Sequence, residues 1–287
     1  MNFKSRARAH QKLFRENILR IHRFDKYESM LCPQDAKAGA NFCVDFPGLF
    51  KIVRKRYRFE NHAAVYSNML RSEHIPYNFF IPLMLDESNN ITLNILNAFI
   101  VNRPVIRIND IRIEWHPEPK ADYLDDNTAF DVYIDCDGTS GKIGVGIEVK
   151  YTEQSYPYGP TEKKRMNNLS SPYHQVTNKC RLYRDGKVDC LKLQKFKQTW
   201  RNHLLGEAMV LKGNIKNFYS ILLYPSGNSY QSDVVKEYSS LLKPDCLDRF
   251  IGLTYETFIK IATQHCPKSE NYQQWLDYLT KRYIIST

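Results

Sequence analysis

Residues 128–153 read TAFDVYIDCDGTSGKIGVGIEVKYTE, and this stretch decides the fold. Apolar residues alternate with other residues over 130–136 and again over 143–149. A period of two residues is typical of a β-strand that has one face on a core. The residues Asp137-Gly-Thr-Ser-Gly141 between the two runs are typical of a turn. The sequence therefore predicts a β-hairpin.

The same pattern predicts a pair of carboxylates on one face of this hairpin. If the turn centres on Thr139 and Ser140, Asp131 falls directly opposite Glu148 on the face that is not apolar. Two opposed carboxylates repel and destabilise a sheet by up to about 1 kcal/mol. A divalent cation between them would turn this repulsion into binding. The alternative is a solvated strand edge with scattered charges.

Other residues of this face agree with a metal site. Lys150 follows Glu148 by two residues, so its ammonium should point the same way as the carboxylates. Gly144 and Gly146 occupy further positions of the face, and we expect them to leave room for another backbone or a ligand.

The set of Asp131, Glu148 and Lys150 resembles the motif of the PD-(D/E)xK phosphodiesterase superfamily, which has the restriction-endonuclease-like fold. The resemblance implies that Asp131 and Glu148 bind one or two Mg²⁺ ions, with Mn²⁺ as a substitute, and that Lys150 is the catalytic lysine. The proline of the motif is absent, because Phe130 precedes Asp131. Segments 72–83, 151–153 and 198–205 are similar to those of a bacterial subgroup of the superfamily.

The resemblance implies two further site residues. Gln198 looks like the glutamine that reaches the active site in the exonuclease branch of the superfamily, although its helix face could simply be solvated. Glu73 resembles the glutamate of an early helix that completes the metal site in many members. Its alternative is a first-turn carboxylate that interacts with the helix dipole, and Glu60 competes for the same role.

A basic span after the hairpin predicts a nucleic-acid cradle, since Lys and Arg side chains neutralise phosphates. A solvated surface is the alternative. Gln198, Arg201 and Asn202 share one face of a predicted helix over 191–211, where Arg201 could meet a phosphate. The residues that we expect to contact nucleic acid are Lys163, Lys164, Arg165, Arg201 and Asn202.

The order of predicted elements is helix, three strands, helix and strand, which is the order expected of the endonuclease-like core. The sequence thus predicts an α/β fold with a mixed central sheet flanked by helices. Residues 71–225 would form the nuclease core, with helical additions over 1–70 and 226–287. We expect these parts to form one compact unit.

Composition limits the other classes of protein. The chain has 287 residues, a formal net charge of +10 and 43% apolar residues, which indicates a globular protein with a polyanionic partner. It has no apolar segment typical of a signal peptide or a membrane span. The seven cysteines contain no Cys-x-x-Cys pair, so neither a zinc site nor a disulfide framework is indicated. We therefore expect a cytoplasmic protein, and a homodimer or larger complex is compatible with the sequence.

These observations favour a metal-dependent nuclease that acts on DNA, with RNA left open as a substrate. The alternative function is a non-catalytic nucleic-acid-binding module with the same fold, acting in a larger defence or repair complex. No phosphate-binding Gly-x-x-x-x-Gly-Lys loop is present, which argues against ATP hydrolysis.

Overall fold

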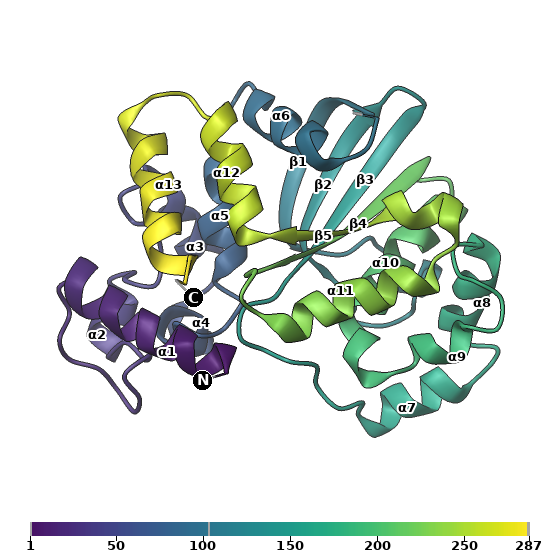
Figure 1. Cartoon of the computed structure of the whole chain (residues 1–287), viewed down its shortest axis with the longest axis horizontal. Helices are drawn as coiled ribbons and strands as arrows, with labels where there is room; N and C mark the ends of the chain where they lie inside the picture. Colours follow the sequence, from purple (N-terminus) through teal and green to yellow (C-terminus); the bar gives the residue numbers. More distant parts are fainter. Residues whose placement is uncertain (1, 103, 286–287) are drawn as a thin grey trace.

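The computed structural model describes residues 2–102 and 104–285. Its centre is a five-stranded sheet with the order β1-β2-β3-β4-β5, and Figure 1 shows the sheet between two groups of helices. The first three strands are antiparallel, whereas β3, β4 and β5 pair in parallel. The strands are β1 (Val105–Trp115), β2 (Phe130–Gly138), β3 (Gly141–Val149), β4 (Asn217–Tyr224) and β5 (Phe250–Thr254). The predicted α/β architecture with a mixed sheet is confirmed.

The predicted hairpin is formed by β2 and β3. Its ladder runs from Val132 opposite Ile147 to Gly138 opposite Gly141, so the turn centres on residues 139–140. This confirms the predicted turn and its register. Asp131 and Glu148 are the next residues along the two strands in the same register.

The two faces of the sheet carry separate apolar cores. Val132, Ile134 and Cys136 of β2 lie in a core with helices from both ends of the chain. Tyr133 and Phe130 lie in the second core, on the other face. Phe130 departs from the predicted alternation, since its ring covers Gly146, which has no side chain of its own.

The glycines of β3 differ from the sequence expectation. A Cβ atom at Gly144 would lie 2.8 Å from the hydroxyl of Tyr133, and one at Gly146 would lie 2.6 Å from the Phe218 ring. The room that these glycines leave is therefore filled by side chains of the core, and not by a ligand.

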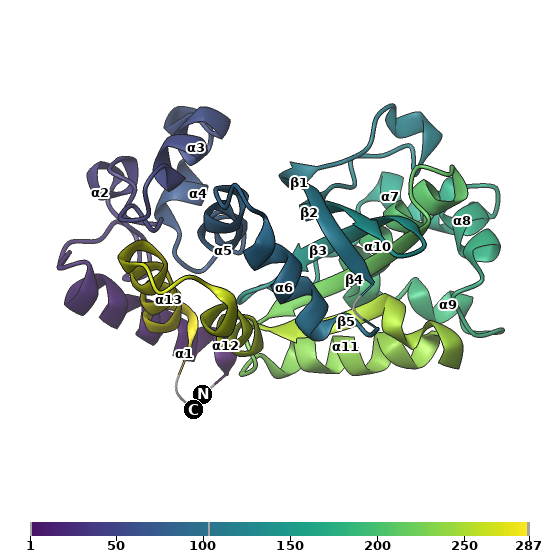
Figure 2. The same ribbon diagram turned by 90° about the horizontal axis from the view of Figure 1, so that it is seen from above.

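Helices of the first core come from distant parts of the sequence (Figure 2). The helix α5 is apolar on all sides and almost wholly buried, as expected of a helix inside a core. It contacts β1, β2, α3 and α13. The helices of this half are α1 (Phe3–Leu13), α2 (Pro33–Lys37), α3 (Leu49–Arg56), α4 (Ala63–Ser67), α5 (Ile75–Met84), α6 (Asn90–Phe99), α12 (Tyr255–His265) and α13 (Glu270–Tyr283).

Helices of the second core cover the other face of the sheet. The helix α10 contacts both β3 and β4, and its Gly206 permits this close approach because a Cβ there would lie 2.2 Å from the ring of Phe218. The remaining helices of this half are α7 (Pro160–Asn167), α8 (Pro172–Cys180), α9 (Val188–Leu191), α10 (Lys197–Leu211) and α11 (Ser229–Leu241).

The sheet extends into the predicted C-terminal addition. Residues 226–287 were expected to be helical, but they contain β5, which pairs with β4. The helix predicted over 191–211 is also interrupted, and its regular part begins at Lys197. The strand β5 is fixed by its pairing with β4, and the segment before Lys197 contacts α11, so tertiary contacts and not a long periodic pattern decide both places.

Candidate active site

The parallel strand β3 brings Glu148 and Lys150 to the end of the sheet. The backbone N–H of Lys150 donates to the Leu223 carbonyl at 2.9 Å. The carbonyl of Lys150 accepts a hydrogen bond from the Tyr255 hydroxyl at 2.7 Å. A residue of β4 and the first residue of α12 (Tyr255–His265) therefore fix the backbone from which the Lys150 side chain extends.

The side chains of Glu148 and Lys150 form a buried ion pair. The Lys150 ammonium contacts Glu148 Oε1, and both residues are only 6% exposed. The other carboxylate oxygen, Oε2, accepts a hydrogen bond from the Asn202 amide of α10. Glu148 thus has a partner on each oxygen, which offsets the cost of burying its charge.

Asp131 lies beside this pair at the start of β2. Its Oδ2 accepts a hydrogen bond from the Val149 N–H at 2.7 Å, across the hairpin. Burial raises the pKa of Asp131 well above its usual range, and the charge of Glu148 adds to the rise while Lys150 opposes it. The two carboxylates are close enough to repel each other.

The negative charges that disfavour ionisation of Asp131 favour the charged form of Lys150. Burial alone would lower the pKa of Lys150, but the carboxylates of Glu148 and Asp131 raise it above its usual range. Lys150 is therefore held in its protonated form at neutral pH.

A small cavity gives access to Glu148 from the side of α10. It has a volume of about 140 Å³ and is lined by Glu148, Gln198, Arg201 and Asn202, together with residues 127–129. The structure therefore brings the predicted Gln198 and Asn202 to one opening beside Glu148. The role of Gln198 stays a prediction.

A divalent cation fits the chemistry of this pair. Carboxylate oxygens are the ligands that hard cations such as Mg²⁺ prefer. Burial raises the pKa of Asp131 and the charge of Glu148 raises it further, and a bound cation would oppose both effects because it favours the ionised carboxylate. Asp131 and Glu148 are thus able to hold a metal ion if Lys150 yields its contact with Glu148.

Glu73 does not join these carboxylates. It pairs with Arg71 near the surface, and over residues 2–102 and 104–285 no group of three or more metal-binding side chains is found. Glu60 lies in the N-terminal region, 3.8 Å from Lys37. A third metal ligand from either residue stays a prediction.

Glu114 is an acid of this region that the sequence reasoning missed. Ile113 pairs with Val132 and Trp115 with Phe130, so Glu114 lies opposite Asp131 on β1. Its backbone has a φ of 51°, which is uncommon for a residue with a side chain. The charge of Glu114 adds to the raised pKa of Asp131. In the sequence, Glu114 is only the residue before the last one of β1. The pairing of β1 with β2 is what places it opposite Asp131.

The predicted phosphate-binding residues are not equally free. The Arg201 guanidinium donates to Thr128 Oγ1 at 3.0 Å and contacts Asp126 and Glu162 at 2.9 Å each. Arg165 lies 3.7 Å from the same Asp126. These two arginines are therefore engaged by acids that the sequence reasoning did not pair with them.

The neighbouring lysines remain available. Lys163 and Lys164 of α7 are exposed and make no ion pair with any described residue. Contact of these lysines with nucleic acid stays a prediction.

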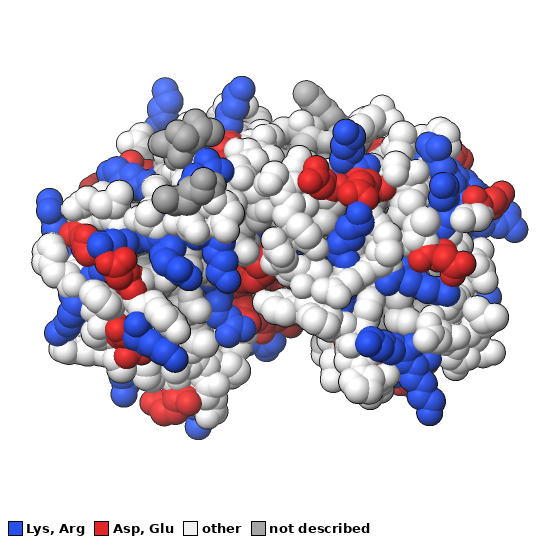
Figure 3. All heavy atoms as spheres, turned by 60° about the horizontal axis from the view of Figure 1, so that its bottom comes forward, with Lys and Arg blue, Asp and Glu red and all other residues white. Residues whose placement is uncertain are grey.

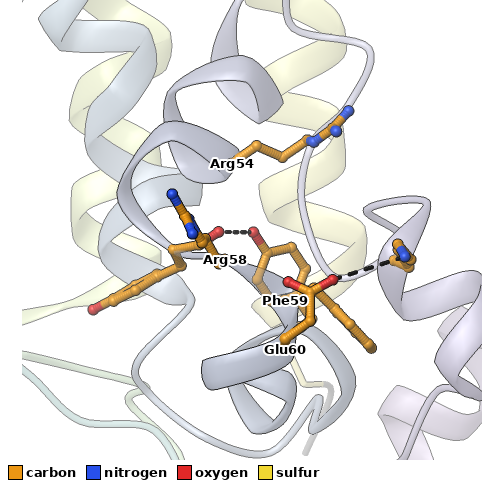
Figure 4. Close-up of a pocket in the computed structure, with 7 residues that line it drawn as sticks. Arg54, Arg58, Phe59 and Glu60 are labelled. Carbon is orange, nitrogen blue, oxygen red and sulfur yellow. Dashed lines mark hydrogen bonds and ion pairs between the residues drawn. The ribbon is translucent and has the colours of Figure 1, made fainter.

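A second basic surface lies on the N-terminal half, around the end of α3. Figure 4 shows Arg54, Arg58 and Phe59 around a cavity there, with the Glu60 carboxylate turned to Lys37. The cavity has a volume of about 320 Å³. It shares no lining residue with the cavity beside Glu148.

Comparison with known proteins identifies the family. Comparison with curated proteins and with solved structures gives no significant match. Among the helices of the described residues, none has the length and apolar character needed to cross a membrane. The model of the PD-(D/E)XK nuclease superfamily matches residues 1–285. The chain therefore belongs to the PD-(D/E)XK nuclease superfamily.

Proposed function

We propose that this protein is a metal-dependent nuclease that hydrolyses phosphodiester bonds of DNA. The observation that carries the proposal is the convergence of Asp131, Glu148 and Lys150 at one end of the hairpin, with the two carboxylates repelling and Lys150 charged. Nucleases of this superfamily generally use divalent metal ions, and the fit of Asp131 and Glu148 to a hard cation supports Mg²⁺.

Each residue of the site has a part that follows from its contacts. Mg²⁺ bound by Asp131 and Glu148 would polarise the phosphate and lower the pKa of a bound water. Asn202 holds one oxygen of Glu148 and so fixes the direction of that carboxylate. Gln198 lines the same opening and is suited to orient a phosphate or water by its amide.

Lys150 is suited to act as a hydrogen-bond donor. Its ammonium has three donors, and once the contact with Glu148 is yielded to the metal ion they are directed to the substrate. They can hold the attacking water and meet a phosphate oxygen. Charge that builds up on the phosphate oxygens in the transition state is stabilised by such a cation.

The charge of the molecule supports a nucleic acid as the substrate. The formal net charge is +10, and exposed Lys163 and Lys164 lie on α7, whose Glu162 contacts Arg201 at the opening beside Glu148. A polyanion is therefore attracted to the molecule, and RNA remains an alternative substrate of the same chemistry.

The test is Mg²⁺-dependent cleavage by the purified protein and by Lys150→Met. This substitution keeps most of the buried aliphatic stem but removes the ammonium, so cleavage should fall by at least about a hundredfold. Lys142→Met is the matched control, because Lys142 is an exposed residue of the same strand and should cut as the wild type does. Product formation from labelled single- and double-stranded DNA in Mg²⁺, compared with EDTA, gives the measurement.

Two results would contradict this proposal. Undiminished cleavage by Lys150→Met would remove Lys150 from the mechanism. Wild-type protein that binds DNA but never cuts it would instead favour a non-catalytic nucleic-acid-binding module.

A further inference from the structure

A second and larger cavity lies directly after the active-site strand. It has a volume of about 820 Å³, and residues 152–156, which follow Lys150, form part of its lining. The rest comes from α1, from two segments near residues 27–30 and 68–71, and from the start of α11. Figure 3 shows a notch between two lobes of the molecule on the side that is turned forward there.

The charge of this cavity favours an anion. Three cations line it, namely Lys4, Arg8 and Arg71, against one acid, Glu153. Lys4 and Arg8 are exposed, and neither makes an ion pair within the part of the chain that the structure describes.

The single acid of the lining is already engaged. The carboxylate of Glu153 accepts backbone N–H groups from Ser72 at 2.5 Å, Tyr151 at 3.2 Å and Thr152 at 3.1 Å. Its oxygens are therefore already held by the backbone and are directed to N–H groups of the protein. Lys4 and Arg8 of α1, by contrast, have no acidic partner among the described residues.

Exposed aromatic rings line the same cavity. Tyr27 is 53% exposed and Tyr156 is 54% exposed, although tyrosine is more often partly buried in a folded protein. Tyr27 belongs to the N-terminal half and Tyr156 to the loop after β3, so the rings come from two different parts of the lining. Tyr156 follows Lys150 by six residues in the chain, so its ring lines the part of the cavity that continues from the active-site strand.

We infer that this cavity, whose lining begins two residues after Lys150 in the chain, binds an unpaired strand of nucleic acid. Lys4 and Arg8 would meet the phosphates, and Tyr27 and Tyr156 would stack on bases. Positive grooves with aromatic side chains are typical of single-strand binding, because the bases of a duplex are already stacked on one another. A volume of about 820 Å³ is that of a pocket for one small ligand, which suits a few nucleotides of one strand. The inference rests on the proposed function for its substrate but not for its test.

The test measures binding in EDTA, where no cleavage is possible. Fluorescence anisotropy with a labelled single-stranded DNA oligonucleotide, and with a blunt duplex of the same sequence, gives the two affinities for wild-type protein. We expect the single strand to bind at least tenfold more tightly than the duplex. Equal or tighter binding of the duplex would overturn the inference.

Variants of the cavity identify where the strand lies. Lys4→Glu with Arg8→Glu should weaken single-strand binding by at least tenfold and reduce the slope of log affinity against log salt by about 1.4, since each lost phosphate contact removes about 0.7. Tyr156→Ala should weaken binding by about tenfold with little change of slope. Tyr156→Phe keeps the ring and should bind within about twofold of wild type.

A charge-matched control separates local contact from overall charge. Lys260→Glu with Lys268→Glu makes the same change of net charge at exposed positions on and after α12, and its affinity should stay within about twofold of wild type. Equal loss of affinity in both double variants would overturn the inference. Thermal unfolding of each variant checks that the fold is kept.

The two proposals fail in different ways. Cleavage in Mg²⁺ that is unaffected by the variants at Lys4, Arg8 and Tyr156 would end the inference about the cavity and leave the nuclease function standing. If the protein binds a single strand through these residues but does not cut it, the inference about the cavity stands and the nuclease function fails.

Discussion

Glu207 shows how a single buried residue makes stability depend on pH. It lies on α10, is 7% exposed, and burial raises its pKa to about 7 from a usual value of 4.5, while Arg249 opposes the rise. Between these two values the folded protein keeps the proton and the unfolded chain loses it. The free energy of unfolding should therefore fall as pH rises through this window, by about 3 kcal/mol for this group alone.

The prediction for Glu207→Gln follows from that sign. The neutral amide imitates the protonated acid, so the unfolding free energy of the variant should not fall through this window. The difference between Glu207→Gln and wild type should therefore grow by about 3 kcal/mol as the pH rises from about 4 to about 8. Urea unfolding at several pH values measures it. Glu87→Gln changes an exposed carboxyl and should show no such trend. A constant difference between Glu207→Gln and wild type would contradict the prediction.

Metal binding gives a second prediction at the residue scale. Mn²⁺ should raise the thermal unfolding temperature of wild-type protein, because a ligand of the folded state stabilises it. Asp131→Asn should remove most of this increase, since it takes away one of the two carboxyl groups beside Lys150 that can bind the cation. Glu73→Gln is the informative comparison. If the Mn²⁺-induced rise in unfolding temperature survives Asp131→Asn but is lost in Glu73→Gln, the metal ion binds at Glu73 and not at Asp131.

Single residues also mark how far sequence reasoning reaches. The hairpin positions of Asp131 and Glu148 follow from alternation and the turn, both of which are local. The pairing of Arg201 with Asp126 and Glu162 depends on residues 75 and 39 positions away, and no local pattern encodes it. Contacts of this kind decide which cations are free for a substrate, so the basic cradle could be predicted only as a span and not as a surface.

At the scale of elements, the packing of α10 on the sheet depends on one glycine. Alanine in a helix interior is usually about 1 kcal/mol better than glycine. At Gly206, however, the new Cβ would lie 2.2 Å from the Phe218 ring of β4. The helix would have to move from the sheet or the ring would have to turn, and overpacking of this kind costs about 1–3 kcal/mol.

We therefore expect Gly206→Ala to lower the free energy of unfolding by about 2 kcal/mol. Combining it with Phe218→Ala removes the clash, so the double variant should lose less than the sum of the two single variants. Urea unfolding of all four proteins completes the cycle. A Gly206→Ala variant that is more stable than wild type would show that α10 does not approach β4 this closely.

The elements that were predicted well are those with long or regular patterns. The hairpin repeats every two residues, and β4 is a nearly continuous apolar run that is buried along its length, as expected of a parallel strand with both faces covered. By contrast, β5 has only five residues. A strand this short has too few alternations to reveal itself, and its pairing with β4 defines it.

At the scale of the whole molecule, the two ends of the chain close over one core. Arg282 of α13 is fully buried, and its guanidinium donates to the Asn41 carbonyl at 2.8 Å and lies 3.2 Å from His74 Nε2. From α1, Gln11 donates to the Arg282 carbonyl and to the Tyr151 hydroxyl, both at 2.8 Å. The predicted N-terminal addition, the core and the C-terminal addition thus share one buried network.

This network predicts one cooperative unfolding transition for the whole chain. Arg282→Met should lower the free energy of unfolding by about 1–3 kcal/mol for each buried acceptor that is left without a donor. The adjacent Lys281→Met is the control, because Lys281 is half exposed and forms a surface ion pair with Asp277, and it should cost less than about 1 kcal/mol.

Two tryptophans report on this transition from opposite parts of the molecule. Trp200 lies in α10 and Trp275 in α13, and both are fully buried. In single-tryptophan backgrounds that keep one or the other, Arg282→Met should shift the urea midpoint by the same amount for both probes. A shift seen by Trp275 alone would mean that the C-terminal helices unfold separately from the nuclease core. Because α1 and α13 meet through Gln11 and Arg282, a shared shift would also mean that the wall of the large cavity is as stable as the sheet that carries the active site.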